Sequence, residues 1–205
     1  NGNPAQVLNL SLGGGGSCSS TTQAAINSAR ALGSTVVVAA GNANTDASNS
    51  TPANCTGVIT VAATNRAGAR AYYSNYGAVV DMAAPGGGSG GGILSTLNIG
   101  ITSPSSDSYE FYQGTSMAAP HVAGVAALIY AIDPTITPDG VETILTTTTR
   151  TFAGSCSQCG SGMVDAAAAV AAAAGGNSGA GVLDNGTPVS GLAAADTDSP
   201  LYYTM

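Results

Sequence analysis

The sequence contains no lysine and no tryptophan, and its 205 residues include a single histidine, His121. Four arginines face eleven acidic residues, so the formal net charge is −7. Four scattered arginines cannot build the basic patch that nucleic acids or anionic membranes require, so we expect neither as a partner. No apolar run approaches the ~20 residues that cross a bilayer, and no signal peptide is visible. The composition therefore favours a tightly packed globular domain.

Cysteine is scarce, and the four residues present allow three pairings. Cys156 and Cys159 lie among glycines, where a local disulfide is geometrically easy, which leaves Cys18 to pair with Cys55. The alternatives for CSQC are a zinc half-site, which needs about four ligands, and a redox motif, which should follow a strand at a helix start. Because CSQC lies in a glycine-rich loop, disulfides and a secreted, extracellular setting are the better interpretation.

Apolar runs alternate with helical patterns up to about residue 176. The predicted buried strands are residues 7–12, 35–40, 57–63 and 78–82. The predicted helices are residues 21–32 and 117–132, one that begins at Thr137-Pro138, and one from Asp165 to about Ala174. This alternation indicates an α/β domain with a mainly parallel sheet flanked by helices.

One domain boundary is expected, near residue 176. Residues 1–176 form the first domain, which enters a strand pattern almost at once, so we expect its amino-terminal part to be missing. GNSGAG, near residue 176, is typical of a flexible linker. Residues 177–205 then contain an Asn-Gly turn signal and the start of a β-rich module.

Residues 114–124, GTSMAAPHVAG, place Ser116 where a loop turns into a strongly apolar helix. The free N–H groups and the dipole of that helix end favour negative charge, so an oxyanion beside Ser116 would be stabilised. The commonest role of a serine there is to cap the helix. The triplet alone therefore leaves a nucleophile and a cap as alternatives.

The longer string GTSMAAPHVAGVAAL resembles the nucleophile region of the subtilisin-like serine proteases (subtilases). Three further stretches match in the family's order, namely SLGG at 11–14, AAGN at 39–42 and DMAAPG at 81–86. The resemblance covers roughly residues 5–174 and implies a subtilisin-like fold and a secreted serine endopeptidase. NGTPVSGL and LYYT, near the C-terminus, are similar to the start of the pre-peptidase C-terminal β domain of many secreted subtilases.

The resemblance implies a role for each motif. Ser116 would be the nucleophile, and Asn42 would donate its amide to the oxyanion together with the Ser116 N–H. A turn asparagine after Gly41 is the alternative for Asn42. The implied substrate-binding residues are Ser11, Leu12 and Gly13, beside which the peptide adds as a strand, and Ala39, Ala40, Gly41 and Ser50, around the S1 pocket. Small residues there favour a roomy pocket for large apolar or aromatic side chains.

Two further expectations follow from the resemblance. The Thr51–Pro52 bond is expected to be cis, as at the matching family position. Asp81 resembles a position close to a weak cation site in some relatives, although an isolated surface carboxylate is the better interpretation. We therefore assign no metal ligand, leave room for a structural calcium ion, and expect no other cofactor.

A subtilase orders its triad Asp, His, Ser, and the ten residues before Ser11 contain neither Asp nor His. His121 cannot act as the base, because five residues along a helix give a rise of about 7.5 Å and a rotation of about 140° from Ser116. We interpret His121 as a buried, hydrogen-bonded structural residue. We expect the chain alone to be inactive, and a missing amino-terminal segment, on the same or a separate chain, to carry the Asp and His.

Two other classes of protein are alternatives. A non-catalytic binding or structural domain on a subtilase scaffold would lack Asp and His upstream, whereas the presence of both Ser116 and Asn42 favours a protease. An unrelated α/β hydrolase would need a G-x-S-x-G elbow, and GTSMA lacks the second glycine. The sequence therefore predicts part of a subtilase that acts on protein or peptide substrates through an acyl-enzyme on Ser116.

Overall fold

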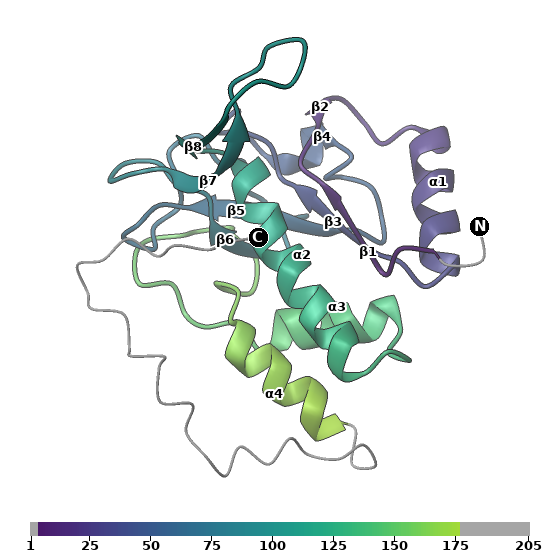
Figure 1. Cartoon of the computed structure of the whole chain (residues 1–205). Coiled ribbons are helices and arrows are strands. Elements are labelled where there is room, and N and C mark those ends of the chain that lie inside the picture. Colours follow the sequence, from purple (N-terminus) through teal and green to yellow (C-terminus); the bar gives the residue numbers. More distant parts are fainter. Residues whose placement is uncertain (1–3, 177–205) are drawn as a thin grey trace.

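A four-stranded parallel sheet lies at the centre of the computed structural model, which describes residues 4–176. The strand order is β1-β3-β5-β6. The bounds are β1 Val7–Leu10, β3 Thr35–Ala39, β5 Ile59–Thr64 and β6 Met82–Pro85. Every residue of β3 and β5 is buried, as continuous apolar runs in a parallel sheet predict. The α/β class expected from the sequence is therefore confirmed (Figure 1).

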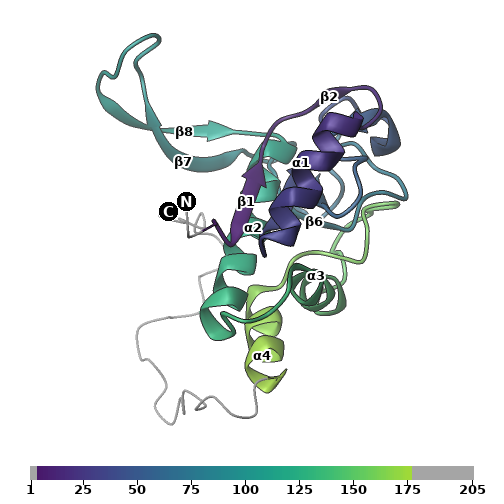
Figure 2. The ribbon, with the colours of Figure 1, turned by 90° about the vertical axis from the view of Figure 1, so that its right-hand side faces the viewer.

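Alternate side chains of the strands enter two different cores. Val36 and Val38 pack with Ile26 of α1 (Ser20–Ala31) on one face of the sheet. Val37 and Val61 belong instead to the core under α2 (Thr115–Ile132), which contacts all four strands. The helices α3 (Pro138–Thr147) and α4 (Ala166–Gly176) pack against α2 (Figures 1 and 2). The sheet is thus covered by helices on both faces.

Helix α2 is long and apolar enough to cross a membrane by length and composition alone. Half of it is buried inside the fold, where Val122, Ala126 and Ile129 are fully covered by the sheet and the neighbouring helices. This packing is that of a core helix, and it explains why the helix is apolar on nearly all sides.

Short elements surround the main sheet. β2 (Gly14–Gly15) pairs antiparallel with β4 (Ser50–Thr51), and the short 3₁₀ helix η1 (Ala47–Asn49) precedes β4. β7 (Ile93–Asn98) and β8 (Asp107–Tyr112) form an antiparallel hairpin that projects from the body of the domain (Figure 2). The sequence interpretation did not include this hairpin.

Several expected boundaries differ from the observed ones. The strand expected at residues 78–82 begins only at Met82, because the Val80 N–H closes a turn onto the Gly77 carbonyl. The first strand ends at Leu10 rather than at residue 12, since β3 offers it no further partner after Val38. The helices deviate by only a few residues. Thr137 and Asp165 accept the expected capping bonds, and Ser19, which was not predicted as a cap, accepts one at the start of α1.

The predicted covalent features are confirmed. Cys18 is bonded to Cys55 and Cys156 to Cys159, and the Thr51–Pro52 bond is cis. The predicted linker and β-rich module at residues 177–205 lie outside the described residues, so that part of the domain division stays a prediction.

Candidate active site

The carboxyl ends of β1 and β3 and the start of α2 meet at one edge of the sheet. Parallel strands end at the same edge, which is where α/β proteins place their sites. Ser11 follows β1, Asn42 follows β3, and Ser116 is the second residue of α2. Hydrogen bonds link Ser11 to Ser116 and Asn42 to Thr115. Residues that are far apart in the sequence are therefore brought together.

Ser116 does not cap its helix. The N-cap residue of α2 is Gly114, and no side chain makes a capping hydrogen bond there. The Ser116 hydroxyl instead donates to the Ser11 carbonyl oxygen, at 3.3 Å. This is a long contact for two oxygens, so the hydroxyl is only loosely held. The geometry removes the capping alternative and leaves the hydroxyl beside the N–H groups of the helix start.

The carbonyl of Ser116 is released from the helix by Pro120. In a regular helix the N–H four residues later would donate to this oxygen, but proline has no N–H. The Ser11 hydroxyl fills the vacancy and donates to the Ser116 carbonyl oxygen at 2.7 Å. Ser11 and Ser116 thus exchange two hydrogen bonds, which fix the candidate substrate strand against the candidate nucleophile.

The side chain of Asn42 is oriented by Thr115. Its Oδ1 accepts from the Thr115 N–H at 2.8 Å and from the Thr115 hydroxyl at 2.9 Å. A backbone N–H can only donate, so the atom that faces it must be the amide oxygen. The Asn42 Nδ2 and the Ser116 nitrogen both lie within 3.6 Å of the point that a Cβ on Gly114 would occupy. Two N–H groups therefore border one small space beside Ser116.

The expected S1 residues contribute mainly main chain. The Ala39 side chain belongs to the core under α2, and that of Ala40 lies in a small core on the opposite face of the sheet. Ala39 and Ala40 can therefore contribute only backbone atoms to a wall of the expected S1 pocket. Ser50 is half-buried, and its Oγ lies 3.4 Å from the point that a Cβ on Gly41 would occupy. This places Ser50 at the base of the Gly41 turn.

Leu12 and Gly13 lie after the end of β1 and are exposed. Leu12, 60% exposed, also lines an apolar pocket of about 630 Å³ with Leu10, Ile26 and Pro52. Gly13 lies beside β4, because a Cβ there would come within 3.1 Å of the Thr51 carbonyl oxygen. Within the part of the chain that the structure describes, residues 11–13 pair with no strand, so this segment is available for a further strand.

Sequence reasoning passed over Tyr73, which supports the glycine segment before the nucleophile. Its buried hydroxyl contacts the carbonyl oxygens of Gly86 and Gly87 at 2.6 and 2.9 Å, and burial raises its pKa to about 12. The Gly114 N–H in turn donates to the Gly86 carbonyl. A tyrosine among several in one stretch gives no signal of such a role, because only the fold brings residues 73, 86 and 114 together.

His121 interacts with its own helix rather than with Ser116. Its Nδ1 lies 2.8 Å from the Met117 carbonyl oxygen, one turn earlier, and therefore donates to it. The side chain is half-buried rather than fully buried as expected from the sequence. The ring is therefore bonded to the main chain of its own helix, as expected of a hydrogen-bonded structural histidine.

Asp81 is not the isolated surface carboxylate expected from the sequence. It is half-buried, and its Oδ2 accepts from the Thr60 N–H at 2.7 Å. Burial raises the pKa of Asp81 to about 6, although the Thr60 N–H opposes this. Within residues 4–176, no group of three or more His, Cys, Asp and Glu side chains is arranged to hold a metal ion. A single carboxylate is a small part of the six to eight oxygens that calcium takes.

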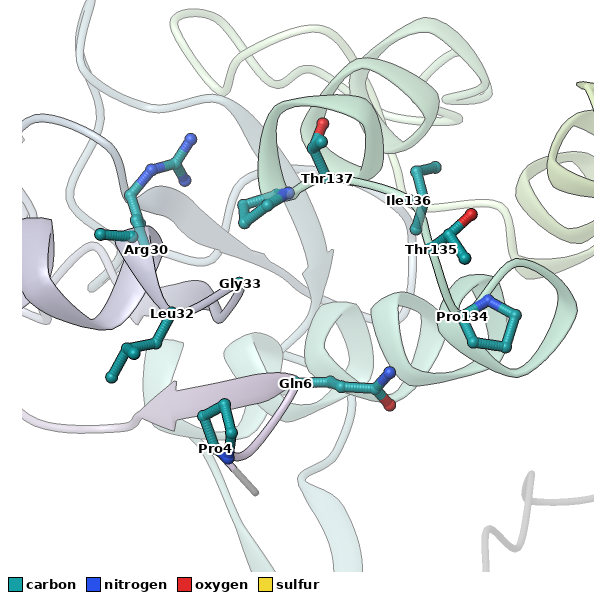
Figure 3. Close-up of a pocket in the computed structure, with 11 residues that line it drawn as sticks. Pro4, Gln6, Arg30, Leu32, Gly33, Pro134, Thr135, Ile136 and Thr137 are labelled. Carbon is teal, nitrogen blue, oxygen red and sulfur yellow. The ribbon is translucent and has the colours of Figure 1, made fainter. Parts of the chain in front are cut away.

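A second pocket, of about 670 Å³, lies far from these residues. Figure 3 shows it between the start of β1, the end of α1 and the connection from α2 to α3, with Arg30, Gln6 and Ile136 among its lining residues. Arg30 also pairs with Asp139 and donates to the Gly57 carbonyl. None of the candidate site residues lines this pocket, so it has no part in chemistry at Ser116.

Comparison with known proteins shows which family this chain resembles. The peptidase S8 model, described as the Subtilase family, matches residues 2–175. An extracellular protease of Xanthomonas campestris pv. campestris is 57% identical over all of this chain and 36% of its own length. An extracellular basic protease of Dichelobacter nodosus is 50% identical over 85% of this chain and 29% of its own length. The chain thus spans about a third of the length of these relatives.

Two solved protease structures are also similar to this chain. A protease from Pseudoalteromonas arctica superposes with a TM-score of 0.82 at 62% identity, covering 84% of this chain and 52% of that one. A cold-adapted subtilisin-like serine proteinase superposes with a TM-score of 0.61 at 34% identity, covering 78% of this chain and 52% of that one. With a family model that matches most of the chain and relatives of this similarity, the chain belongs to the subtilase family.

Proposed function

We propose that this chain is the nucleophile and oxyanion part of a secreted serine endopeptidase. The observation that carries the proposal is that two nitrogens with N–H groups, Asn42 Nδ2 and the Ser116 backbone N, lie within 3.6 Å of one point at Gly114, where α2 begins. Such a pair stabilises the negative oxygen that forms when a hydroxyl attacks a peptide carbonyl. The extracellular names of the relatives and the two disulfides support secretion.

In the proposed reaction, Ser116 Oγ bonds to the scissile carbonyl carbon as its proton passes to a histidine base. The carbonyl oxygen becomes an oxyanion that accepts hydrogen bonds from Asn42 and from the Ser116 N–H. The C–N bond then breaks, the departing amine takes the proton from the base, and water hydrolyses the acyl ester on Ser116. These steps need a group next to Ser116 that can both accept and donate a proton.

The base comes from outside the 205 residues. His121 is bonded to the Met117 carbonyl, and it is the only histidine of the chain. We propose that an amino-terminal segment of the same protease, joined to this chain or separate from it, contributes the Asp and His. This chain together with that segment is called the complete protease below.

The substrate is proposed to be an extended polypeptide. Its backbone would add as a strand beside Ser11, Leu12 and Gly13, whose segment leaves the β1 ladder before Ser11. The side chain before the scissile bond would enter a pocket walled by the main chain of Ala39, Ala40 and Gly41, with Ser50 at its base. Small residues and backbone leave room for large apolar or aromatic side chains there.

The test compares this chain alone with the complete protease, each with Ser116→Ala, Asn42→Ala and His121→Ala variants. A fluorophosphonate probe with mass detection and a peptide substrate with an aromatic residue before the scissile bond report labelling and turnover. The expected result is turnover by the complete protease only, abolished by Ser116→Ala and spared by His121→Ala. Asn42→Ala should lower kcat by roughly 10²–10³, the loss known for an oxyanion donor in a protease of this same family.

Two outcomes would overturn this assignment. Turnover by the complete protease that survives Ser116→Ala would exclude Ser116 as the nucleophile. If the natural amino-terminal segment carries no Asp and His in the expected motifs, and the folded protein that includes it neither hydrolyses the peptide nor reacts with the probe, the chain is a binding or structural domain on this scaffold.

A further inference from the structure

Asn75 is an internal asparagine with every side-chain hydrogen-bonding position occupied. It is 1% exposed. Its Oδ1 accepts from the Ala43 and Thr45 N–H groups at 2.9 and 3.1 Å, and its Nδ2 donates to the Ala40 carbonyl and the Ser50 Oγ, both at 2.9 Å. An amide side chain has two donors and two acceptor positions, so Asn75 is saturated.

These bonds bracket Asn42 on both sides. The Asn75 backbone N–H donates to the carbonyl of Gly41, the residue before Asn42, at 2.9 Å. The Asn75 Oδ1 accepts from Ala43, the residue after Asn42. Asn42 itself is exposed, so its own packing fixes it little. The position of its backbone therefore depends on Asn75, and that of its side chain on Thr115.

The other half of the Asn75 amide reaches the proposed S1 pocket. Ala40 belongs to the wall and Ser50 to the base, and one NH₂ group bonds both. The approach is close, because a Cβ on Gly41 would come within 2.4 Å of the Asn75 Nδ2. Gly41 has φ = 104°, which also favours glycine. Asn75 and Gly41 thus fit together where the wall turns into Asn42.

We infer that Asn75 is a positioning residue that holds Asn42 at the oxyanion and ties the S1 wall to its base through one amide. The inference rests on the proposed function and adds a specific residue to it. Its acceptor side acts on Asn42, and its donor side acts on the pocket. The two sides can be separated, because aspartate keeps the acceptors and loses the NH₂ donors.

The matched control is Asn65. Its Oδ1 also accepts from two loop N–H groups, those of Ala67 and Ala69 at 3.0 and 3.2 Å. Both bonds lie within its own turn, residues 65–69, rather than on residues 40–50 or Ser116. Asn65→Ala therefore removes a similar asparagine turn and leaves the site untouched, so it measures the general effect of losing such a turn.

The experiment measures kcat and KM of the complete protease on peptides with a large or a small side chain before the scissile bond. Asn75→Ala should lower kcat at least ~10-fold, equivalent to about 1.4 kcal/mol of transition-state stabilisation. Asn65→Ala should leave kcat unchanged. Asn75→Asp should keep more of kcat than Asn75→Ala and raise KM for the large side chain more than for the small one. Its first oxygen still accepts from Ala43 and Thr45, whereas its second oxygen repels the Ala40 carbonyl on the pocket side.

A double-variant cycle shows whether Asn75 acts through Asn42. In an Asn42→Ala background the oxyanion donor is already absent, so adding Asn75→Ala should lower kcat by no more than about 2-fold. The positioning role would be overturned if Asn75→Ala lowered kcat by the same factor with and without Asn42→Ala. It would also be overturned if kcat were equal for Asn75→Ala and Asn65→Ala. If Ser116→Ala and Asn42→Ala themselves leave kcat unchanged, the proposed function fails instead.

Discussion

Thr115 donates two hydrogen bonds to one oxygen of Asn42, from its backbone N–H and from its hydroxyl. The same hydroxyl accepts from the Gly41 N–H at 3.1 Å. The residue before the candidate nucleophile therefore determines which way the Asn42 amide points. The candidate nucleophile and the proposed oxyanion donor are thus linked through a fully buried threonine.

Thr115→Val keeps the shape of this side chain and removes its hydroxyl. The Asn42 oxygen then has one partner instead of two, and the Gly41 N–H has none, so we expect kcat of the complete protease to fall roughly 10-fold, or about 1.4 kcal/mol. Thr115→Ser keeps the hydroxyl and should stay within about 3-fold of the unmodified enzyme. Equal kcat values for the two variants would show that this hydroxyl does not orient Asn42.

Ser11→Ala should destabilise the fold through the carbonyl of Ser116. That oxygen has lost its helical partner to Pro120 and depends on the Ser11 hydroxyl, so its removal should cost about 1–3 kcal/mol. Pro120→Ala restores an N–H four residues later, and Ser11→Ala should cost at least about 1 kcal/mol less in that background. Denaturant unfolding of the four proteins measures the coupling, and simple additivity would contradict it.

Asp81 should make the stability of the fold depend on pH. Its pKa rises to about 6 in the folded protein, above the ~3.9 of an unfolded chain. The folded state therefore holds this proton more tightly. The resulting stabilisation is fully present below about pH 4 and is lost as the pH rises through about 6. At pH 7 Asp81 is ionised in both the folded and the unfolded protein, so its proton no longer stabilises the fold.

Asp81→Asn removes this titration and keeps an oxygen to accept from the Thr60 N–H. The free energy of unfolding of both proteins is measured in EDTA. The value for the variant minus the value for the unmodified protein should increase by up to about 3 kcal/mol from pH 4 to pH 7. Two parallel pH profiles would show that burial of this carboxylate costs little. If added calcium reduces the difference in free energy of unfolding between the two proteins, this would instead indicate a cation at Asp81.

The two disulfides should differ in their effect on stability. Cys18–Cys55 closes a sequence separation of 37 residues and Cys156–Cys159 one of 3. Loop entropy then gives about 4 kcal/mol for the first bond and about 2 kcal/mol for the second. Replacing each pair by serine and measuring denaturant unfolding tests this ranking. A larger loss at the shorter loop would contradict the entropic account.

Much of the fold could be predicted because the apolar runs are unambiguous. Residues 35–39 and 59–63 are buried on both faces of the sheet, and such strands appear in the sequence as continuous aliphatic runs. The β7–β8 hairpin was missed for the opposite reason. Its strands are largely exposed, follow a run of glycines and carry Tyr109 and Phe111 on the surface, so no burial pattern marks them.

The candidate site likewise contains residues that the sequence reveals and residues that only the fold reveals. Ser116 and Asn42 lie in motifs that are continuous in the sequence, so they could be named before the fold was known. Asn75 and Tyr73 act on residues 13 to 35 positions away, and an asparagine before a glycine-containing turn is ordinarily read as a turn residue. The fate of the Ser116 carbonyl was hidden as well, since Pro120 and Ser11 meet there only in the folded chain.

The carbonyl of Ser11 has a consequence for the resting state. The Ser116 hydroxyl rests on this oxygen at 3.3 Å, and a peptide that adds as a strand along residues 11–13 would offer its own N–H groups to the same edge. Arrival of a substrate in the proposed peptidase would thus displace the serine from its acceptor and leave the hydroxyl ready for a base. In the proposed peptidase, the Ser11 carbonyl would therefore hold the Ser116 hydroxyl until a substrate strand arrives.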